Sequence, residues 1–325
     1  MLDAALERPA PPRLRGGVST QMYRPATITD SHIHLSTAGT ARARRTRLSQ
    51  LDERLVEAYH GRWSRSLASR DEQGPETDVP DVETVARRWL AELDAAGIDR
   101  AVFFPAYDAP DDLLAFIASA PDRFVGYTTF DPTNRENAHR LQQQVDEGGV
   151  RGLKLYPMAG HFHADDDACF PVYEVCADKG IPVIIHFGIS IDATHDLRYG
   201  NPLDLSHIAL RFPSVRWIIP HFGTGFFREA LMLAAQYQNV YLDTSSSNNW
   251  VQYAPVPTTV ADLFRRTLDA LGSERLIFGT DSSFFPRGFR TNILEQQLAI
   301  CNDLNLSPAE MDNIFNDNIR RIIDG

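Results

Sequence analysis

Short apolar runs alternate along the chain with longer segments in which apolar residues recur at helical spacing. The short runs are rich in Val, Ile, Phe and Tyr, a composition typical of buried strands. Eight of them occur, at 26–35, 100–106, 124–130, 150–157, 181–188, 215–223, 239–246 and 275–284. Strands that alternate with helices form a parallel sheet. Eight such units over roughly 300 residues favour a (β/α)8 TIM-type barrel. The alternative is a doubly wound sheet, but this sequence has no glycine-rich phosphate loop after its first predicted strand.

The segments between the strands carry their own boundary signals. Apolar residues at 82, 85, 86, 89, 90, 93 and 96 share one helical face, and Gly97 follows them as a terminating residue. Near the other end of the chain, Ser307, Pro308 and Glu310 form a capping box with proline at the first helical position. These signals predict a helix over 82–96 and another that begins after Ser307.

The segment 36–81 interrupts this rhythm, because it is far longer than the usual connection between a barrel strand and its helix. It is rich in basic and aromatic residues, namely Arg42, Arg44, Arg45, Arg47, Arg54, Tyr59, His60, Arg62, Trp63 and Arg65. Two interpretations remain open. One is a solvated helical insertion; the other is a lid over the barrel mouth, acting within its own chain or across a homodimer contact. Its last part, 71–81, is predicted to be a loose, exposed linker.

Composition narrows the class of protein. A formal charge of −11 argues against a general nucleic-acid binder. It says little about the small-molecule substrate that is the expected partner, because a basic pocket can coexist with an acidic surface. No apolar run is long enough for a membrane span. Residues 1–21 are predicted to be a flexible leader without the apolar stretch of a signal peptide, and 22–325 form the barrel. Cys169, Cys176 and Cys301 form no C-x-x-C pair, so free thiols and a cytoplasmic location are expected.

Ionisable residues recur at the carboxyl ends of the predicted strands. His32 and His34 end the first strand and share one face because strand side chains alternate. His186, His221 and Asp281 end the fifth, sixth and eighth strands. In a barrel these ends meet at one mouth. Any one histidine is more often a core residue, but imidazoles and a carboxylate that converge in this way predict a divalent metal site with a position open for water.

The order of these motifs resembles a known family. The first is the H-x-H of DSHIH at 30–34, followed by GLKLYP at 152–157, IHFG at 185–188, PHFG at 220–223 and FGTD at 278–281. The set, which spans 26–323, resembles the amidohydrolase superfamily and its amidohydrolase-2 branch. That branch includes aminocarboxymuconate semialdehyde decarboxylase, resorcylate-type decarboxylases and pyrone-dicarboxylate lactonase.

The resemblance implies a role for each residue. His32, His34 and His186 would bind one divalent ion, Zn²⁺ by preference or Mn²⁺. Asp281 would bind the ion or its water and act as general base. His221 would shuttle a proton or stabilise charge. The physical chemistry agrees, since a zinc-bound water has a pKa of about 7 and gives its proton readily to a nearby carboxylate.

Five further residues are candidates for substrate binding. Lys154 has three interpretations: a free ammonium that binds a substrate anion, a carboxylated bridge between two metals as in binuclear relatives, or a buried lysine paired with an acid. Arg287 and Arg290 follow Asp281 closely and are expected either to hold a substrate carboxylate or to lie on the surface. Tyr156 and Trp250 either line the pocket or only pack against it.

A second H-x-H pair, His161 and His163, follows the fourth strand. It lies after Pro157 and Gly160, so it is expected in a loop, at the pocket rim or on the surface, rather than in a second metal site. The acidic run at 165–167 is expected to be a solvated turn or helix start.

Three functions are compatible with this site. The first is hydrolysis of a small ester, lactone or amide that carries a carboxylate, through a metal-activated water. The second is non-oxidative decarboxylation of an aromatic or unsaturated acid, which uses the same ligands. The third, a barrel kept for binding alone, would need no open metal site. Hydrolysis is the preferred prediction. The strand-end residues do not identify the substrate, because specificity lies in loops.

Overall fold

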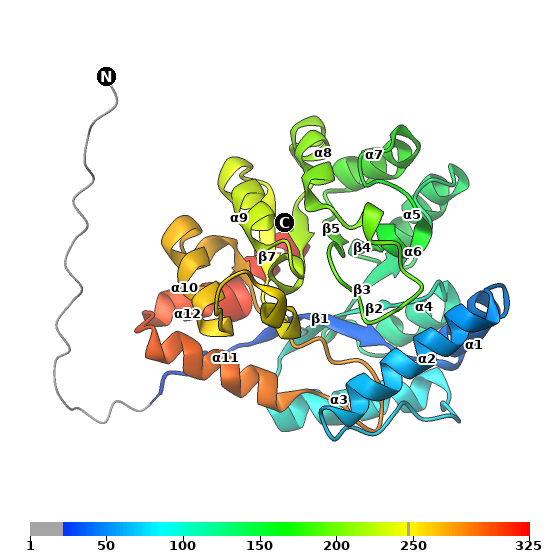
Figure 1. Ribbon diagram of the computed structural model, residues 1–325, viewed down its shortest axis with the longest axis horizontal. Helices are drawn as coiled ribbons and strands as arrows, with labels where there is room; N and C mark the ends of the chain where they lie inside the picture. Colours follow the sequence, from blue (N-terminus) through cyan, green and yellow to red (C-terminus); the bar gives the residue numbers. More distant parts are fainter. Residues whose placement is uncertain (1–21, 246–247) are drawn as a thin grey trace.

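Eight parallel strands, hydrogen-bonded in the order β1 to β8, wind around a barrel (Figure 1). The structure, a computed structural model, describes residues 22–245 and 248–325. The strands are β1 (Thr29–Leu35), β2 (Arg100–Pro105), β3 (Phe124–Thr129), β4 (Gly152–Leu155), β5 (Val183–Ile185), β6 (Trp217–Ile219), β7 (Val240–Asp243) and β8 (Leu276–Ile277). Each lies within one of the eight runs identified in the sequence, so the predicted (β/α)8 barrel is confirmed.

Contacts between β8 and β1 bring the two ends of the sheet together. The Ser31 N–H donates to the Phe278 carbonyl (3.0 Å), and the His34 N–H donates to the Ser282 carbonyl (2.8 Å). Ile33 and Ser282 also form a parallel bridge. The first and last strands therefore meet beside the His32 and Asp281 segments, which are about 250 residues apart in the sequence.

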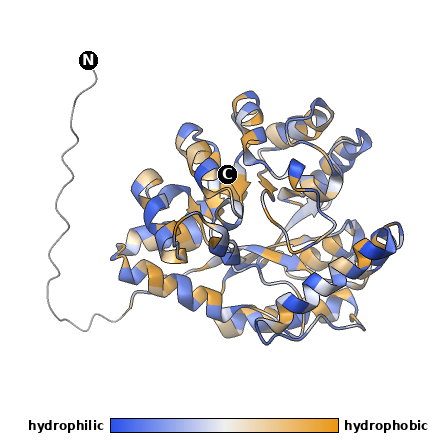
Figure 2. Cartoon of the chain, in the orientation of Figure 1, coloured by the Kyte–Doolittle hydropathy of each residue, from blue (hydrophilic) through white to orange (hydrophobic). Residues whose placement is uncertain are grey.

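Helices connect successive strands and surround the barrel (Figure 1). They are α3 (Val82–Ala96), α4 (Pro110–Ser119), α5 (Glu136–Asp146), α6 (Pro157–Gly160), α7 (Phe170–Lys179), α8 (Leu205–Arg211), α9 (Phe227–Gln236), α10 (Val260–Leu271), α11 (Thr291–Asp303), α12 (Pro308–Asp312) and α13 (Asn318–Asp324). Hydrophobic and hydrophilic residues alternate along them (Figure 2), as expected for helices that bury one face.

Both predicted helix boundaries are confirmed. Helix α3 spans Val82–Ala96 and ends at Gly97, whose φ of 67° is a left-handed conformation that glycine adopts without strain. Helix α12 begins at Pro308, where the Glu310 N–H donates to the Ser307 hydroxyl oxygen (3.4 Å) and the Ser307 N–H donates to the Glu310 carboxylate (2.8 Å).

A second apolar cluster fills the barrel interior, separate from the larger one between strands and helices. It joins inward-facing residues such as Val102 and Ile277 to Ile319 of α13. Arg100, at the start of β2, pairs with Asp324 at the end of α13 (2.9 Å). Helix α13 therefore closes the barrel at the amino ends of its strands, and the opposite end is left for the site.

Two helices, α1 (Ala38–Ser49) and α2 (Glu53–Ala68), form the insertion after β1. Helix α1 contacts the start of α4, where the Gly39 N–H donates to Asp112 (2.8 Å). Its Arg47 reaches the loop after β5 and donates to Asp192 (3.2 Å) and Thr194 (2.8 Å). The insertion is thus attached to loops on the mouth side of the barrel.

The second half of the insertion contacts the loop after β8. The Trp63 ring lies 6.0 Å from that of Phe284, and Glu72 pairs with Arg287 (3.1 Å). The segment 71–81 contains no helix or strand, but the Glu76 N–H donates to the Phe285 carbonyl (3.0 Å). Much of this stretch is exposed, as expected of a linker, but it is not loose, because Glu72 and Glu76 are held by an ion pair and a hydrogen bond.

The predicted leader, 1–21, lies outside the described residues. Within 22–245 and 248–325, no helix combines the length and the apolar character needed to cross a bilayer. Cys169, Cys176 and Cys301 are buried and free, as the sequence predicted.

Candidate functional site

Three of the predicted residues form a compact group at the carboxyl ends of the strands. His32 lies on β1, His221 follows β6 and Asp281 follows β8, and one ligand atom from each lies within 4.8 Å of the other two. His32 is fully buried, and His221 is 2% exposed. The group is sealed from bulk water except at Asp281, whose side chain is 16% exposed.

The other two predicted ligands lie beside this group. The His34 Nε2 atom is 3.2 Å from Asp281 Oδ1. The His186 ring lies 5.2 Å from the His221 ring, and its Nε2 is 3.4 Å from the Ile189 carbonyl oxygen. All five ionisable residues therefore meet at one mouth. His221, predicted to act in proton transfer, lies as close to the centre as His32 does.

The backbone at this mouth is shaped to bring the side chains together. His221 and Asp281 have φ angles of 55° and 59°, a left-handed conformation that is costly for residues with a Cβ and is often found at functional sites. Between β8 and Asp281, Gly279 approaches β1 so closely that a Cβ there would lie 2.8 Å from the His32 Cβ. Only glycine allows this approach.

Asp243 and Ser245, at the end of β7, also contact the site. The His32 Nδ1 atom is 2.6 Å from Asp243 Oδ2, and the Ser245 hydroxyl oxygen lies 2.8 Å from His221 Nδ1. Sequence reasoning missed both residues. The signal was present, because Asp243 follows an apolar strand just as Asp281 does.

Asp30 joins β1 to the loop after β8, below the predicted metal ligands, through hydrogen bonds. Its carboxylate accepts hydrogen bonds from the His32 N–H (2.8 Å), the Thr280 N–H (3.2 Å) and the Thr280 hydroxyl. Burial raises the pKa of Asp30 to about 7, although these hydrogen bonds act in the opposite direction. Asp30 therefore fixes the backbone that carries His32.

The charge states of the centre follow from its burial. Burial lowers the pKa of His221 to about 4 and holds the pKa values of His32 and His186 well below the usual value, so these rings are neutral at neutral pH. Burial alone would raise the pKa of Asp281, but the His34 hydrogen bond and the surrounding imidazoles hold it well below its usual range. Neutral imidazoles and an ionised carboxylate are the forms that bind metals.

These residues fit a divalent ion. The His32 Nε2 atom is buried and has no hydrogen-bond partner among the described residues, a costly state that a metal would relieve. Its other ring nitrogen faces a carboxylate, the arrangement that orients a metal-binding histidine. His32, His34, His186 and Asp281 would hold the ion, and His221 lies within reach of it.

Lys154, on β4, is fully buried beneath the mouth. Its Nζ atom has no hydrogen-bond partner in the described part of the chain and lies 4.9 Å from the Phe104 ring centre and 5.0 Å from that of Tyr156. Burial lowers its pKa to about 7. The interpretation of a lysine paired directly with an acid is therefore wrong. Tyr156 in turn reaches the site, with its hydroxyl 3.5 Å from His34 Nδ1.

The two arginines after β8 differ. Arg290 is 8% exposed, and its Nη1 lies 4.0 Å from Asp281 Oδ2. Arg287 is paired with Glu72 of the insertion, hydrogen-bonded to Ser283 and stacked on a phenylalanine ring. Neither is a solvated surface arginine. Arg290 faces the centre, whereas Arg287 joins the centre's loop to the insertion.

Trp250 is 4% exposed, and its indole N–H donates to the His221 carbonyl (3.0 Å). It thus supports the strained backbone at His221. Its proposed contact with substrate stays a prediction.

The second H-x-H pair lies in the loop after β4. His163 pairs with Asp204 (3.0 Å), and one ligand atom each of His163, Asp165 and Asp204 lie within 4.8 Å of one another. His161 stacks on Tyr199. The His163 side chain is 45% exposed, so an ion pair between loops accounts for this cluster.

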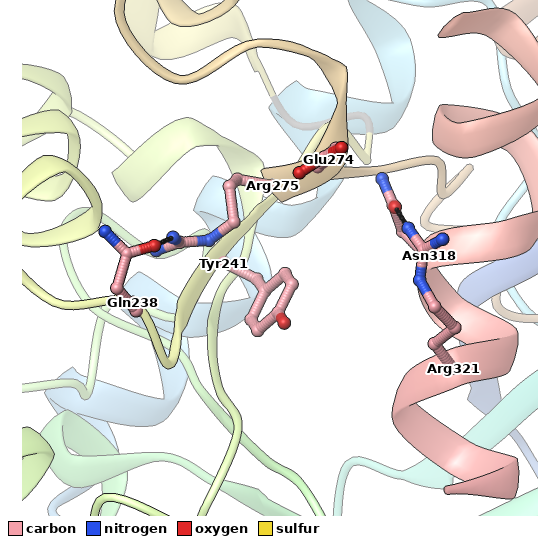
Figure 3. Close-up of a pocket in the computed structure, with 6 residues that line it drawn as sticks. All are labelled: Gln238, Tyr241, Glu274, Arg275, Asn318 and Arg321. Carbon is pink, nitrogen blue, oxygen red and sulfur yellow. Dashed lines mark hydrogen bonds between the residues drawn. The ribbon is translucent and has the colours of Figure 1, made fainter. Parts of the chain in front are cut away.

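A cavity of about 290 Å³ lies at the opposite end of the barrel, between the start of β7, the turn before β8 and α13 (Figure 3). It is lined by Gln238, Tyr241, Glu274, Arg275, Asn318 and Arg321. The Arg275 guanidinium donates to backbone carbonyls, including that of Val240. Its charge is used to hold the fold, and the cavity contains none of the predicted site residues.

Comparison with known proteins agrees with this geometry. Over 110 residues the chain is 32% identical to protein FluG of Emericella nidulans, a match that covers 33% of this chain and only 12% of FluG. Two 5-carboxyvanillate decarboxylases share the fold, each over 92% of this chain with a TM-score of 0.63. That of Sphingomonas paucimobilis is 17% identical and covered over 99% of its length. That of Novosphingobium aromaticivorans, a complex with manganese and a nitrobenzoic acid, is 16% identical and covered over 96%.

An amidohydrolase from Burkholderia multivorans with bound zinc is also similar, with 13% identity, a TM-score of 0.61 and coverage of 92% of this chain and 99% of that chain. At these identities the solved structures establish the fold alone. The amidohydrolase family model matches residues 29–324, nearly the whole described chain. This protein therefore belongs to the amidohydrolase family, of the amidohydrolase-2 type.

Proposed function

We propose that this protein is a metal-dependent hydrolase of a small ester, lactone or amide that carries a carboxylate. The observation that carries the proposal is the protonation state of the ionisable residues at the barrel mouth. Asp281 is ionised, and His32, His186 and His221 are neutral at neutral pH. A site with this many bases is suited to take a proton from water, the first requirement of hydrolysis.

The metal proposal rests on His32 Nε2, which has no hydrogen-bond partner within the described residues and lies 3.7 Å from Asp281 Oδ1, and on the donor set around it. A divalent ion, Zn²⁺ or Mn²⁺, supplies a Lewis acid that polarises the substrate carbonyl and lowers the pKa of water. Relatives with this fold bind zinc or manganese. The donor set suits both ions, with a preference for Zn²⁺ because imidazole dominates it.

The proton transfers fall to residues beside the ion. Asp281 accepts the proton of the attacking water and passes it to the alcohol or amine that leaves when the acyl C–O or C–N bond breaks. His34, at 3.2 Å, orients the Asp281 carboxylate. His221, a neutral base beside the ion, relays a proton during the reaction. Groups of this kind contribute about 10²–10⁴-fold each to rate.

The substrate is expected to be an anion, because two buried cationic groups face the mouth without a hydrogen-bonded acid. The Lys154 Nζ has no hydrogen-bond partner among the described residues, and the Arg290 Nη1 lies 4.0 Å from Asp281 Oδ2. Leaving such groups unpaired is costly, and a substrate carboxylate would pair with them. The planar guanidinium of Arg290 suits a carboxylate especially well.

The insertion is proposed to act as a lid on this mouth. It contacts the loop after β5 through Arg47 and the loop after β8 through Trp63 and Glu72. Both loops follow strands that end in site residues. A segment that rests on them limits the entry of water and shapes the space for substrate.

A second candidate is decarboxylation of an aromatic acid, and Lys154 is the observation that favours it. Decarboxylation needs a proton donor to carbon, and a buried ammonium with a pKa of about 7 can give up its proton at neutral pH. The decarboxylases that share this fold make the reaction a natural second test.

One experiment separates the two reactions. Protein loaded with Zn²⁺ or Mn²⁺ is screened on lactones, anilides and hydroxybenzoates in H₂¹⁸O, with CO₂ detection. We expect ¹⁸O in the product and no CO₂, and we expect Asp281→Asn to abolish turnover. Release of CO₂ without ¹⁸O incorporation would replace hydrolysis by the second candidate. Turnover unaffected by a chelator would exclude both.

A further inference from the structure

The end of β7 contacts two site histidines through their Nδ1 atoms. Asp243 Oδ2 lies 2.6 Å from the Nδ1 of His32, and the Ser245 hydroxyl oxygen lies 3.2 Å from the same atom. The Ser245 hydroxyl also lies 2.8 Å from the Nδ1 of His221, and the Ser245 carbonyl lies 3.4 Å from it. All four residues except His221 are fully buried, and His221 is 2% exposed.

These contacts determine which nitrogen of each ring carries the hydrogen. Asp243 Oδ1 accepts the Ser245 N–H, and Oδ2 lies against the His32 Nδ1 atom. A carboxylate can only accept, so it requires the hydrogen of His32 on Nδ1. A neutral imidazole carries one N–H, and the His32 Nε2 is therefore left with a lone pair. The Ser245 carbonyl, which also only accepts, favours the same tautomer in His221.

We propose that Asp243 and Ser245 are positioning residues that hold His32 and His221 with unprotonated Nε2 atoms directed at the divalent ion. This inference rests on the metal dependence proposed above. One carboxylate and one serine at the end of a single strand thus set the tautomers of residues from β1 and from the loop after β6.

The rigidity of this strand end supports the assignment. Thr244, between the two residues, donates its hydroxyl hydrogen to Gln297 Oε1 (2.6 Å). Gln297 of α11 donates in return to the carbonyls of Thr244 (2.9 Å) and Gly279 (3.2 Å). The end of β7 is therefore tied to the β8 loop. With no solvent to replace a lost acceptor, changing Asp243 must change the state of the His32 ring.

The decisive variant is Asp243→Asn. It keeps the shape of the side chain but places an amide, which has its own N–H donors, where the Ser245 N–H and the His32 Nδ1–H both need an acceptor. We expect its affinity for Zn²⁺, measured by competition with a chromophoric chelator, to fall about 10–100-fold. In metal-free protein labelled with ¹⁵N-histidine, we expect the His32 ring signals to change from the Nδ1–H to the Nε2–H tautomer. The NMR measurement does not depend on activity or on bound metal.

Two further variants complete the test. Ser245→Ala, which leaves the carboxylate in place, should shift His221 toward a mixture of tautomers while His32 is unchanged. Thr244→Val is the matched control, because it removes a buried hydrogen bond at the same strand end without touching either histidine. It should keep both tautomers and the Zn²⁺ affinity.

Unchanged tautomers in both Asp243→Asn and Ser245→Ala would overturn the proposal, as would a loss of affinity in Thr244→Val equal to that in Asp243→Asn. If wild-type protein binds no divalent ion yet shows the expected tautomers, the proposed function fails and the positioning role stands.

Discussion

The strand-end centre and the insertion are built in opposite ways. In the centre, His32 and Asp243 are fully buried and linked at 2.6 Å, and their backbones belong to the barrel ladder. In the insertion, Arg47 is 23% exposed and holds Asp192 through one ion pair. Its partner Asp192 is nearly buried, with a side chain 8% exposed. An ion pair that stays in contact with water contributes about 0–1 kcal/mol, whereas leaving a buried polar atom unpaired costs about 1–3 kcal/mol.

The difference teaches how this family member divides its tasks. The groups proposed to bind metal and move protons are fixed by the sheet, whereas the insertion proposed to cover the mouth is attached by contacts that contribute little free energy. The two regions meet at Arg287, which pairs with Glu72 of the insertion and is six residues from Asp281. Changes in one region should therefore leave the main property of the other intact.

The largest expected effect is loss of the metal. His32→Ala removes a buried ligand from β1, so metal content measured by elemental analysis should fall to a small fraction of one ion per chain and turnover should vanish. His60→Ala, which changes an exposed histidine of the insertion, is the matched control and should keep the ion. Equal loss in both variants would break the comparison between the two regions. Two ions per wild-type chain would instead support a carboxylated Lys154.

A second variant separates ligand from acid–base group within the centre. His221→Ala should lower turnover by about 10²–10⁴-fold while most of the metal is kept, because His32, His34, His186 and Asp281 remain. Metal content and kcat are measured on the same preparation. If the metal falls as steeply as in His186→Ala, then His221 is a ligand, an outcome that its place in the compact group makes worth testing.

Shortening the insertion between 36 and 81 tests the other region. We expect KM to rise roughly tenfold, the order of one lost charge-assisted contact, and turnover to fall while metal content is unchanged. Steady-state kinetics and elemental analysis provide the readout. Normal kinetics in a truncated protein that still binds metal would show that specificity lies in other loops.

The buried imidazole of His221 should make the metal-free centre sensitive to acid. Its pKa is about 4 in the folded chain against 6.5 in the unfolded chain, so below pH 6.5 the unfolded state binds more protons. The free energy of unfolding should therefore fall by about 3 kcal/mol between pH 6.5 and 4. His221→Gln should lose less over the same range in denaturant titrations. The comparison with a variant is needed because Asp30, whose pKa is raised to about 7, acts in the opposite direction.

The smallest effect is expected at a single insertion contact. Arg47→Ala removes the ion pair with Asp192 and the hydrogen bond to Thr194. It should lower the free energy of unfolding by less than about 1 kcal/mol and raise KM slightly. Arg45→Ala, on an exposed position of the same helix, should change neither quantity. A fall in metal content in Arg47→Ala would contradict the separation of the two regions.

Most of the barrel could be predicted because its signals are local. Helix α3 shows its apolar face, its start and its stop within 16 residues of sequence, 82–97. The strand-end rule also located His32, His221 and Asp281 before their distances were known. Side chains at the carboxyl ends of barrel strands converge whatever the loops do, so this prediction needed only the strand boundaries.

What could not be predicted depends on contacts between distant segments. The pairing of Arg287 with Glu72 and the fastening of Glu76 to Phe285 join residues more than 200 positions apart. No periodic pattern in the sequence indicates either contact. The same holds for the left-handed backbone at His221, which the sequence does not mark with a glycine. Asp243 could have been predicted, because it lies at the carboxyl end of an apolar strand, the feature that identified Asp281, but that rule was not applied to it.

The junction between β1 and β8 has a consequence for synthesis. The ribosome releases His32 long before it makes Gly279 and Asp281, which complete the pocket around it. His32 and His34 therefore leave the ribosome before the other proposed ligands exist. The site is complete only when the last strand pairs with the first and α13 covers the barrel interior. Under the proposed metal dependence, metal loading would be a late event, set by barrel closure rather than by the first ligands to emerge.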